Sequence, residues 1–164
     1  MTGSVLQVSV SRGGVPKRAV AEASVSSLGI DGDAHAHPDI HGGQLQALLL
    51  ISSEALAEVS ALGFQLYPGA LGENITTRGL DCRAWRPGQR WRVGQLLVEF
   101  TKRRSPCNTL SVYGPGIQAA IFDAQCKAGD ASSPRWGLSG FYASVIQPGI
   151  VRPGDPISFV EQVV

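Results

Sequence analysis

Glycine and proline recur so closely between residues 68 and 94 that neither a long helix nor a long strand fits there. The breaks fall at Pro68-Gly69, Leu71-Gly72, Arg78-Gly79, Pro87-Gly88 and Val93-Gly94. The whole chain of 164 residues contains 20 glycines and 10 prolines. Glycine supplies turn conformations and proline lacks a backbone N–H donor, so both interrupt regular elements. The sequence therefore predicts short elements joined by turns, as in all-β or α+β folds.

Apolar runs and alternating patterns predict strands in much of the remaining sequence. The predicted strands cover residues 5–10, 19–27, 45–51, 74–77, 89–92, 96–101, 140–147 and 157–160. Apolar residues at helical spacing predict two helices, at residues 54–62 and 117–127. Ser52 and Ser53 can cap the first of these, and Gly63 can end it.

The helix–strand alternation of a doubly wound fold is missing from this order of elements. We expect a mainly β fold, a closed or partly open β-barrel with a few short helices. The length suits a single domain, residues 1–164, with one substantial core.

Charge and hydropathy exclude several classes of protein. The formal net charge of +1 argues against a nucleic-acid partner bound through bulk positive charge. The longest apolar run, residues 47–51, is far too short to span a bilayer. The first twelve residues show no signal-peptide pattern. We expect a cytoplasmic protein without membrane or nucleic-acid partners.

The cysteines point to reduced thiols rather than to disulfides or zinc. Their number is odd and none forms a C-x-x-C pair: Cys82, Cys107 and Cys126. Cys107 differs from the others because it follows a predicted strand within the run Thr101-Lys102-Arg103-Arg104-Ser105-Pro106-Cys107. Nearby cations favour a thiolate, which attacks electrophiles or binds soft metals. An inert cysteine in a turn is the alternative.

The histidines all lie in one segment, Asp31-Gly32-Asp33-Ala34-His35-Ala36-His37-Pro38-Asp39-Ile40-His41. In an extended chain Asp31, Asp33, His35 and His37 would share one side and could bind a divalent metal. The run nearly matches the H-x-H-x-D-H motif of metallo-β-lactamase-like hydrolases, but it has one residue too many and no histidine follows it. A polar loop with turns at Gly32 is the alternative.

Three segments occur in an order typical of a known family. They are Gly29-Ile30-Asp31-Gly32-Asp33-Ala34-His35, then Pro68-Gly69-Ala70-Leu71-Gly72-Glu73-Asn74-Ile75-Thr76, then Arg103-Arg104-Ser105-Pro106-Cys107. The chain resembles the MOSC domain, the C-terminal domain of molybdenum-cofactor sulfurases, which also occurs alone in many bacteria. The resemblance runs from about Val5 to Val160. It implies a β-barrel like the inserted domain of pyruvate kinase.

The resemblance also implies chemistry centred on Cys107. In members that hold the molybdenum cofactor (molybdopterin), this cysteine ligates the metal, and such proteins reduce N-hydroxylated compounds. The resemblance implies catalytic roles for Cys107, Asn74 and Glu73. It implies cofactor contacts from Lys17, Asp31, Asp33, His35, Asn74, Arg103 and Arg104, with the basic side chains facing the pterin phosphate. Glu73 and Asn74 have turn capping as an alternative role.

Three hypotheses stay open at this point. The first is a molybdenum-cofactor protein that binds the metal through Cys107, acts on a small-molecule substrate and needs an electron-donor protein. The second is a non-redox carrier that holds sulfur on Cys107 as a persulfide received from a pyridoxal-phosphate-dependent cysteine desulfurase. The third is a divalent-metal protein built on His35, His37 and Asp39.

Overall fold

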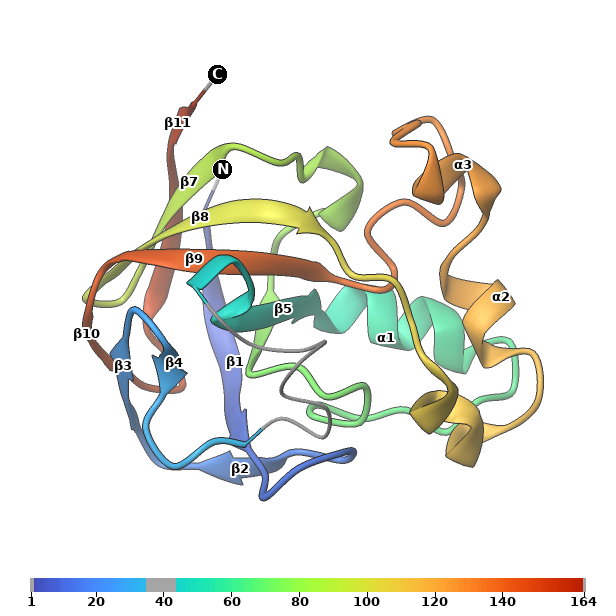
Figure 1. Cartoon of the computed structure of the whole chain (residues 1–164), viewed down its shortest axis with the longest axis horizontal. Helices are drawn as coiled ribbons and strands as arrows, with labels where there is room; N and C mark the ends of the chain where they lie inside the picture. The colour runs from blue at the N-terminus through green and yellow to red at the C-terminus, as the bar shows by residue number, and fades with distance from the viewer. Residues whose placement is uncertain (1, 35–43, 164) are drawn as a thin grey trace.

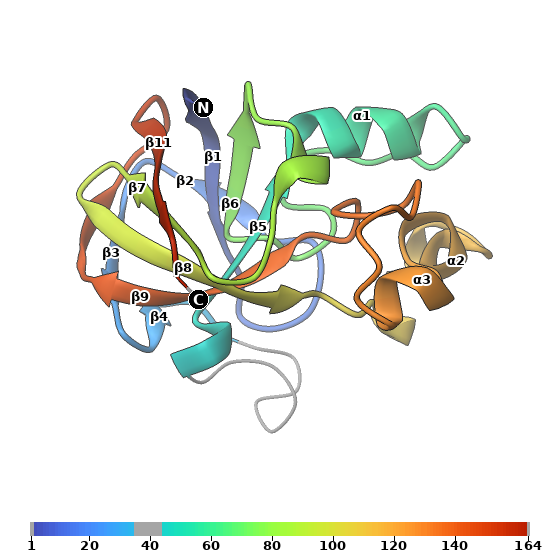
Figure 2. The same cartoon turned by 90° about the horizontal axis from the view of Figure 1, so that it is seen from above.

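Strands of the main sheet close into a barrel in the computed structural model, which describes residues 2–34 and 44–163 (Figures 1 and 2). The strands are β1 (Thr2–Val10), β2 (Arg18–Val20), β3 (Ala23–Ser26), β4 (Gly29–Ile30), β5 (Leu48–Ser52), β6 (Ile75–Arg78), β7 (Gln89–Val93), β8 (Leu96–Arg103), β9 (Phe141–Gln147), β10 (Gly149–Val151) and β11 (Pro156–Gln162). The helices are α1 (Ser53–Ser60), α2 (Ile117–Ile121) and α3 (Ala124–Lys127), with 3-10 turns η1 (Gln44–Gln46), η2 (Cys82–Ala84) and η3 (Asn108–Tyr113). The predicted mainly β barrel is confirmed.

The two ends of β1 pair with different strands, and one of these pairings closes the barrel. The order β11-β7-β8-β9-β5-β6-β1 returns to its start because Thr2 to Ser4 of β1 pair with β11. The other end of β1 pairs with β2, with Val8 opposite Val20. The pair β5–β6 is parallel, and α1 connects these two strands. A smaller sheet has the order β10-β3-β4.

Aromatic rings fill the barrel interior. The ring of Phe100 lies 5.0 Å from that of Trp85, 5.8 Å from that of Trp91 and 5.3 Å from that of Phe141. All four side chains are almost fully buried. Trp91 of β7 and Phe100 of β8 occupy strand positions that alternate with less buried ones, whereas Phe141 begins β9 and Trp85 follows η2. Aromatic groups of this size dominate the energy of such a core.

The sequence prediction of one helix at residues 117–127 is wrong, because two short helices occupy this stretch. Phe122 is extended, with φ of −155°, and ends α2. The carboxylate of Asp123 then accepts a hydrogen bond from the backbone N–H of Cys126 and caps α3. The predicted strand at 19–27 is also divided, because β2 pairs with β1 whereas β3 pairs with β10.

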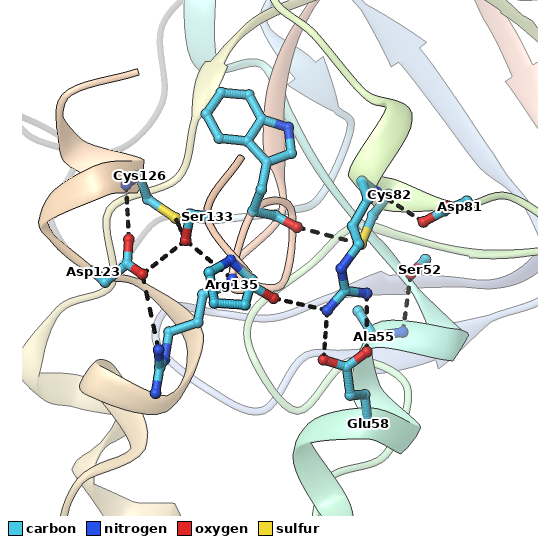
Figure 3. Close-up of polar contacts among 12 residues, drawn as sticks. Ser52, Ala55, Glu58, Asp81, Cys82, Asp123, Cys126, Ser133 and Arg135 are labelled. Carbon is cyan, nitrogen blue, oxygen red and sulfur yellow. Dashed lines mark hydrogen bonds and ion pairs between the residues drawn. The ribbon is translucent and has the colours of Figure 1, made fainter. Parts of the chain in front are cut away.

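All three helices lie beside one end of the barrel (Figures 1 and 2). Figure 3 shows the polar contacts between the chain after α3 and the elements α1 and η2. The guanidinium of Arg83 makes two hydrogen bonds to Glu58, of 2.9 and 2.7 Å, and a third to the carbonyl oxygen of Pro134 at 2.7 Å. The Cys82 thiol lies 3.9 Å from the carbonyl oxygen of Trp136. These contacts fix the segment that connects β8 to β9.

Within the described residues, no helix has both the length and the apolar character needed to cross a membrane.

Candidate functional site

A pocket of about 60 Å3 lies where several segments distant in sequence meet. Cys107, Asn74, Lys17 and Arg104, all singled out from the sequence, are among its lining residues. The full lining consists of Gly14, Val15, Lys17, Ala34, Gln46, Leu49, Gly72, Asn74, Arg104, Cys107, Thr109 and Tyr142. The fold therefore brings a thiol, an amide, a phenol and two cationic side chains to one cavity.

Cys107 occupies the position just before η3 and is only partly buried. Its sulfur lies 2.8 Å from the hydroxyl oxygen of Thr109, and either atom could be the donor. Both side chains line the pocket. Leu110, whose backbone N–H donates to the Cys107 carbonyl, is fully buried and fixes the turn. The thiol thus sits on an anchored turn with its sulfur at the pocket wall.

Lys17, Asp33 and Asn74 form a buried polar network at the pocket. The Lys17 ammonium donates to both oxygens of Asp33, at 2.6 and 2.8 Å, and to the Ala34 carbonyl at 3.3 Å. The Asn74 amide nitrogen donates to Asp33 at 2.8 Å, and its oxygen accepts from the Leu49 backbone at 3.0 Å. The side chains of Lys17 and Asp33 are only 8% and 4% exposed. The positive charge of Lys17 is therefore balanced within the protein.

Glu73 shapes the turn that precedes Asn74. Its fully buried carboxylate accepts from the backbone N–H groups of Gly69 and Leu71, at 3.0 and 3.2 Å, and from the Thr76 hydroxyl at 2.9 Å. Burial raises the pKa of Glu73, although the hydrogen bonds from Gly69 and Thr76 and the nearby Arg104 act in the opposite direction. Gly69 in this turn has φ of +90°, and a side chain there would meet the Lys17 carbonyl.

The Glu73 turn holds both ends of the segment that carries the thiol. Before Cys107, the Arg104 guanidinium donates to the Leu71 carbonyl at 2.9 Å. After Cys107, the Tyr113 hydroxyl donates to the Ala70 carbonyl. Two of the sequence motifs therefore meet in space, because residues 104–113 rest on the backbone of the turn at residues 69–73.

Other residues expected at the site lie elsewhere or outside the described structure. The Arg103 guanidinium lies 5.2 Å above the Trp136 ring and is not among the pocket-lining residues. Asp31 is exposed, and its backbone N–H donates to Ser24. His35, His37 and Asp39 fall outside the described residues. No group of three or more potential metal ligands occurs among the residues that are described.

Thr109 and Tyr142 line the pocket but were not singled out from the sequence. Tyr142 lies opposite Leu49 in the β5–β9 pair, and both line the pocket. Burial raises the pKa of Tyr142, although the nearby Arg104 acts in the opposite direction. In the alternating pattern of residues 140–147, Tyr142 lies on the face opposite Phe141. The pattern therefore predicted that the Tyr142 side chain faces away from the barrel core. No comparable signal marked Thr109.

Residues 37–158 match the family model described as the MOSC domain. The protein YiiM of Escherichia coli is 30% identical over 146 residues, which cover 87% of this chain and 61% of that protein. YflK of Bacillus subtilis is 26% identical, over 80% of this chain and 56% of that protein. The chain thus spans about three fifths of the length of these relatives.

Solved structures agree with this assignment. The crystal structure of YiiM from Geobacillus stearothermophilus matches with a TM-score of 0.71 at 26% identity, over 97% of this chain and 75% of that chain. YiiM from Escherichia coli matches with a TM-score of 0.66 at 25% identity, over 99% of this chain and 71% of that chain.

Proposed function

The chain belongs to the MOSC domain family, and from this premise we propose that its pocket binds the molybdenum cofactor through the sulfur of Cys107 and reduces N-hydroxylated small molecules. The observation that carries the proposal is the position of this thiol. Cys107 is partly exposed at the wall of a pocket lined by Asn74 and Arg104, whereas Cys82 and Cys126 are buried.

The donor set of the pocket suits the metal end of this cofactor. A soft sulfur donor is the appropriate protein ligand for a metal already held by sulfur. Beside it, Arg104 donates through its side chain only to main-chain oxygens of Leu71 and Ser139 within the described residues, so no ion pair there neutralises it. Cys107 would hold the metal, and Arg104 would face negatively charged oxygen atoms. When bound, the cofactor would supply two-electron redox chemistry.

The protein's own groups would position the reactants. The Thr109 hydroxyl, in hydrogen-bond contact with the Cys107 sulfur, would hold that sulfur at the pocket wall. The hydrogen bonds of Asn74 hold its side-chain amide in one orientation. The Tyr142 phenol, whose pKa is raised by burial, keeps its proton on Oη at neutral pH. Electrons would come from a partner protein.

A second function, sulfur transfer, is supported by the same position of the thiol, because Cys107 is partly exposed at the pocket wall and a persulfide on a partner protein could reach it. The Cys107 thiolate would attack the outer sulfur of a cysteine desulfurase persulfide. The sulfur–sulfur bond of the donor would break, its cysteine would leave as a thiolate, and Cys107 would carry the persulfide. No oxidant is needed, because one sulfur–sulfur bond replaces another.

Metal and pterin analysis of protein from cofactor-replete, anaerobic expression tests the first function. We expect wild-type protein to contain molybdenum and pterin, and Cys107→Ser to lose both while it remains folded. Cys126→Ser is the matched control, since its thiol is buried beside Ser133. Equal loading in Cys107→Ser would refute the proposal.

The same samples discriminate the alternatives. Intact mass showing one added sulfur atom on Cys107, without molybdenum, would support sulfur transfer. Zinc that is lost in His37→Ala would instead support the divalent-metal hypothesis.

A further inference from the structure

A second cavity, of about 440 Å3, lies between the connection from α1 to β6 and the end of η3. Among the described residues it is lined by Gly63, Gln65, Tyr67, Val112 and Tyr113, and we call it the tyrosine pocket. None of these residues lines the thiol pocket, although η3 also contributes Thr109 to that pocket. The volume of the tyrosine pocket is in the range found for small-molecule sites.

Neither segment that forms the tyrosine pocket contains a charged side chain. Residues 59–72 and 105–122 include no Asp, Glu, Lys, Arg or His. Burial raises the pKa of Tyr113, so its hydroxyl keeps its proton at neutral pH and adds no charge. An ionised ligand would lose water on entering this pocket and would gain no counter-charge from its lining. The pocket therefore favours an uncharged ligand.

The two tyrosine rings favour a flat aromatic ligand. Their centroids lie 6.4 Å apart, and their planes are inclined by 80°. The hydroxyl of Tyr113 donates to the Ala70 carbonyl, which fixes one ring. Tyr67 is 47% exposed, so the other ring is open to a ligand. Aromatic rings attract one another edge to face or in offset stacks, so a planar ring gains energy here that an aliphatic group of equal size lacks.

Val112 and Gln65 add one apolar side chain and one amide to the lining. Val112 is 74% exposed, so a ligand that covers it removes apolar surface from water. Gln65 is exposed, and its side-chain amide can both donate and accept hydrogen bonds. A ring that carries a nitrogen or oxygen atom therefore finds a polar partner in the same pocket.

We propose that the tyrosine pocket binds an uncharged, planar aromatic compound with a polar atom on its ring. The proposal does not depend on the function proposed above, because Cys107 is not among the residues that line this pocket. Binding would cover the end of η3, the 3-10 turn that directly follows Cys107. The protein would then have a ligand site besides the thiol pocket.

Titration of isotope-labelled protein with indole tests the proposal, because indole is flat and uncharged and has one N–H donor. We expect saturable changes in the amide signals of Gly63, Gln65 and Tyr113. Tyr67→Leu keeps an apolar side chain but removes the ring, so it should weaken binding about three- to tenfold. Phe159→Leu is the matched control, since it removes a ring from a partly buried position in β11 and should change affinity less than about twofold.

Two further compounds test the chemical class of the ligand. Indole-3-acetate adds a negative charge to the same ring system, and cyclohexanol is uncharged but not flat. Each should bind at least about threefold more weakly than indole does. Equal affinity for indole and either compound would overturn the proposal.

Equal weakening in Tyr67→Leu and Phe159→Leu would also overturn it, because the effect would then not belong to this pocket. So would signal changes centred on Asn74 and Tyr142, which would place indole in the thiol pocket, and so would the absence of saturable binding. Cys107→Ser should bind indole as the wild type does. Loss of cofactor or sulfur loading in that variant is therefore a separate outcome, and either proposal can fail alone.

Discussion

The three cysteines have different environments in this protein, because two are buried and one is only partly buried. Burial raises the pKa of Cys82 to about 11, and its thiol faces a main-chain oxygen. Cys126 is buried beside the Ser133 hydroxyl, as Figure 3 shows. Cys107 alone lines the pocket, where a hydroxyl group contacts its sulfur. Reactivity toward a dissolved electrophile should therefore be confined to Cys107 in the folded protein.

Thr109 gives a test at this scale. In Thr109→Val the hydroxyl is lost but the shape is kept, so we expect iodoacetamide to alkylate Cys107 about three- to tenfold more slowly at neutral pH. Thr109→Ser keeps the hydroxyl and should restore most of the rate. Peptide mass analysis checks the site of labelling, with Cys82 and Cys126 unlabelled until denaturant is added. An unchanged rate in Thr109→Val would show that the contact does not affect the sulfur.

At the scale of elements, the turn at residues 69–73 supports the segment at residues 104–113. Arg104 and Tyr113 donate to the adjacent carbonyls of Leu71 and Ala70. The carboxylate of Glu73 satisfies two backbone donors within the same turn. Glu73 therefore supports the turn on which this segment rests, and it does not line the pocket.

Removal of the Glu73 carboxylate tests this support. Glu73→Ala leaves three buried donors without an acceptor, so we expect it to lower the free energy of unfolding by about 2–4 kcal/mol. Urea denaturation measures this change. Glu161→Ala is the control, because Glu161 is exposed and its ion pair with Arg90 is solvated, so the free energy of unfolding should change far less than in Glu73→Ala. A small effect of Glu73→Ala would contradict the supporting role.

The raised pKa of Glu73 also predicts a pH dependence. The folded state binds this proton more tightly than the unfolded state does, so the contribution of Glu73 to stability is largest at low pH and falls as pH rises above 4.5, its ordinary value. Glu73→Gln cannot titrate and should flatten this decline. Urea denaturation of both proteins from about pH 4 to pH 7 measures the two slopes. Parallel slopes would mean that folding leaves this pKa unchanged.

At the scale of the whole molecule, the closed barrel is organised around its aromatic interior. Phe100 contacts the rings of Trp85, Trp91 and Phe141, which come from different parts of the chain. Since the first and last strands pair with each other, the rings are enclosed on all sides of the barrel. Stability of the enclosed core should therefore depend strongly on this one side chain.

Phe100→Ala should lower the free energy of unfolding by about 3–5 kcal/mol, since it leaves a cavity among rigid neighbours. Denaturant unfolding provides the measurement. Phe159→Ala is the comparison, because Phe159 is only partly buried and contacts the Trp91 ring at 5.4 Å. Phe159→Ala should lower the free energy of unfolding by clearly less than Phe100→Ala does. Equal losses in the two variants would argue against a core centred on Phe100.

The sequence located most strands because their signals are local. Alternation along 140–147 and the apolar run at 96–101 correspond to β9 and β8. The prediction that Ser52 caps the helix after β5 is confirmed by its hydrogen bond from the Ala55 backbone at 3.0 Å. The helical spacing of apolar residues predicted one helix at 117–127. That prediction is wrong because the extended Phe122 ends α2 and Asp123 caps a separate helix, α3.

By itself, the sequence determined the barrel class and the family and singled out Cys107 as a candidate, since turns, periodicity and ordered motifs are properties of neighbouring residues. Only the tertiary structure decided which charges the pocket can use. Lys17 is paired with Asp33 and Arg103 stacks on Trp136, whereas Arg104 lines the pocket and donates through its side chain only to main-chain oxygens among the described residues. Ion pairs and stacking depend on distances between residues far apart in the chain, and those distances exist only once the barrel has closed.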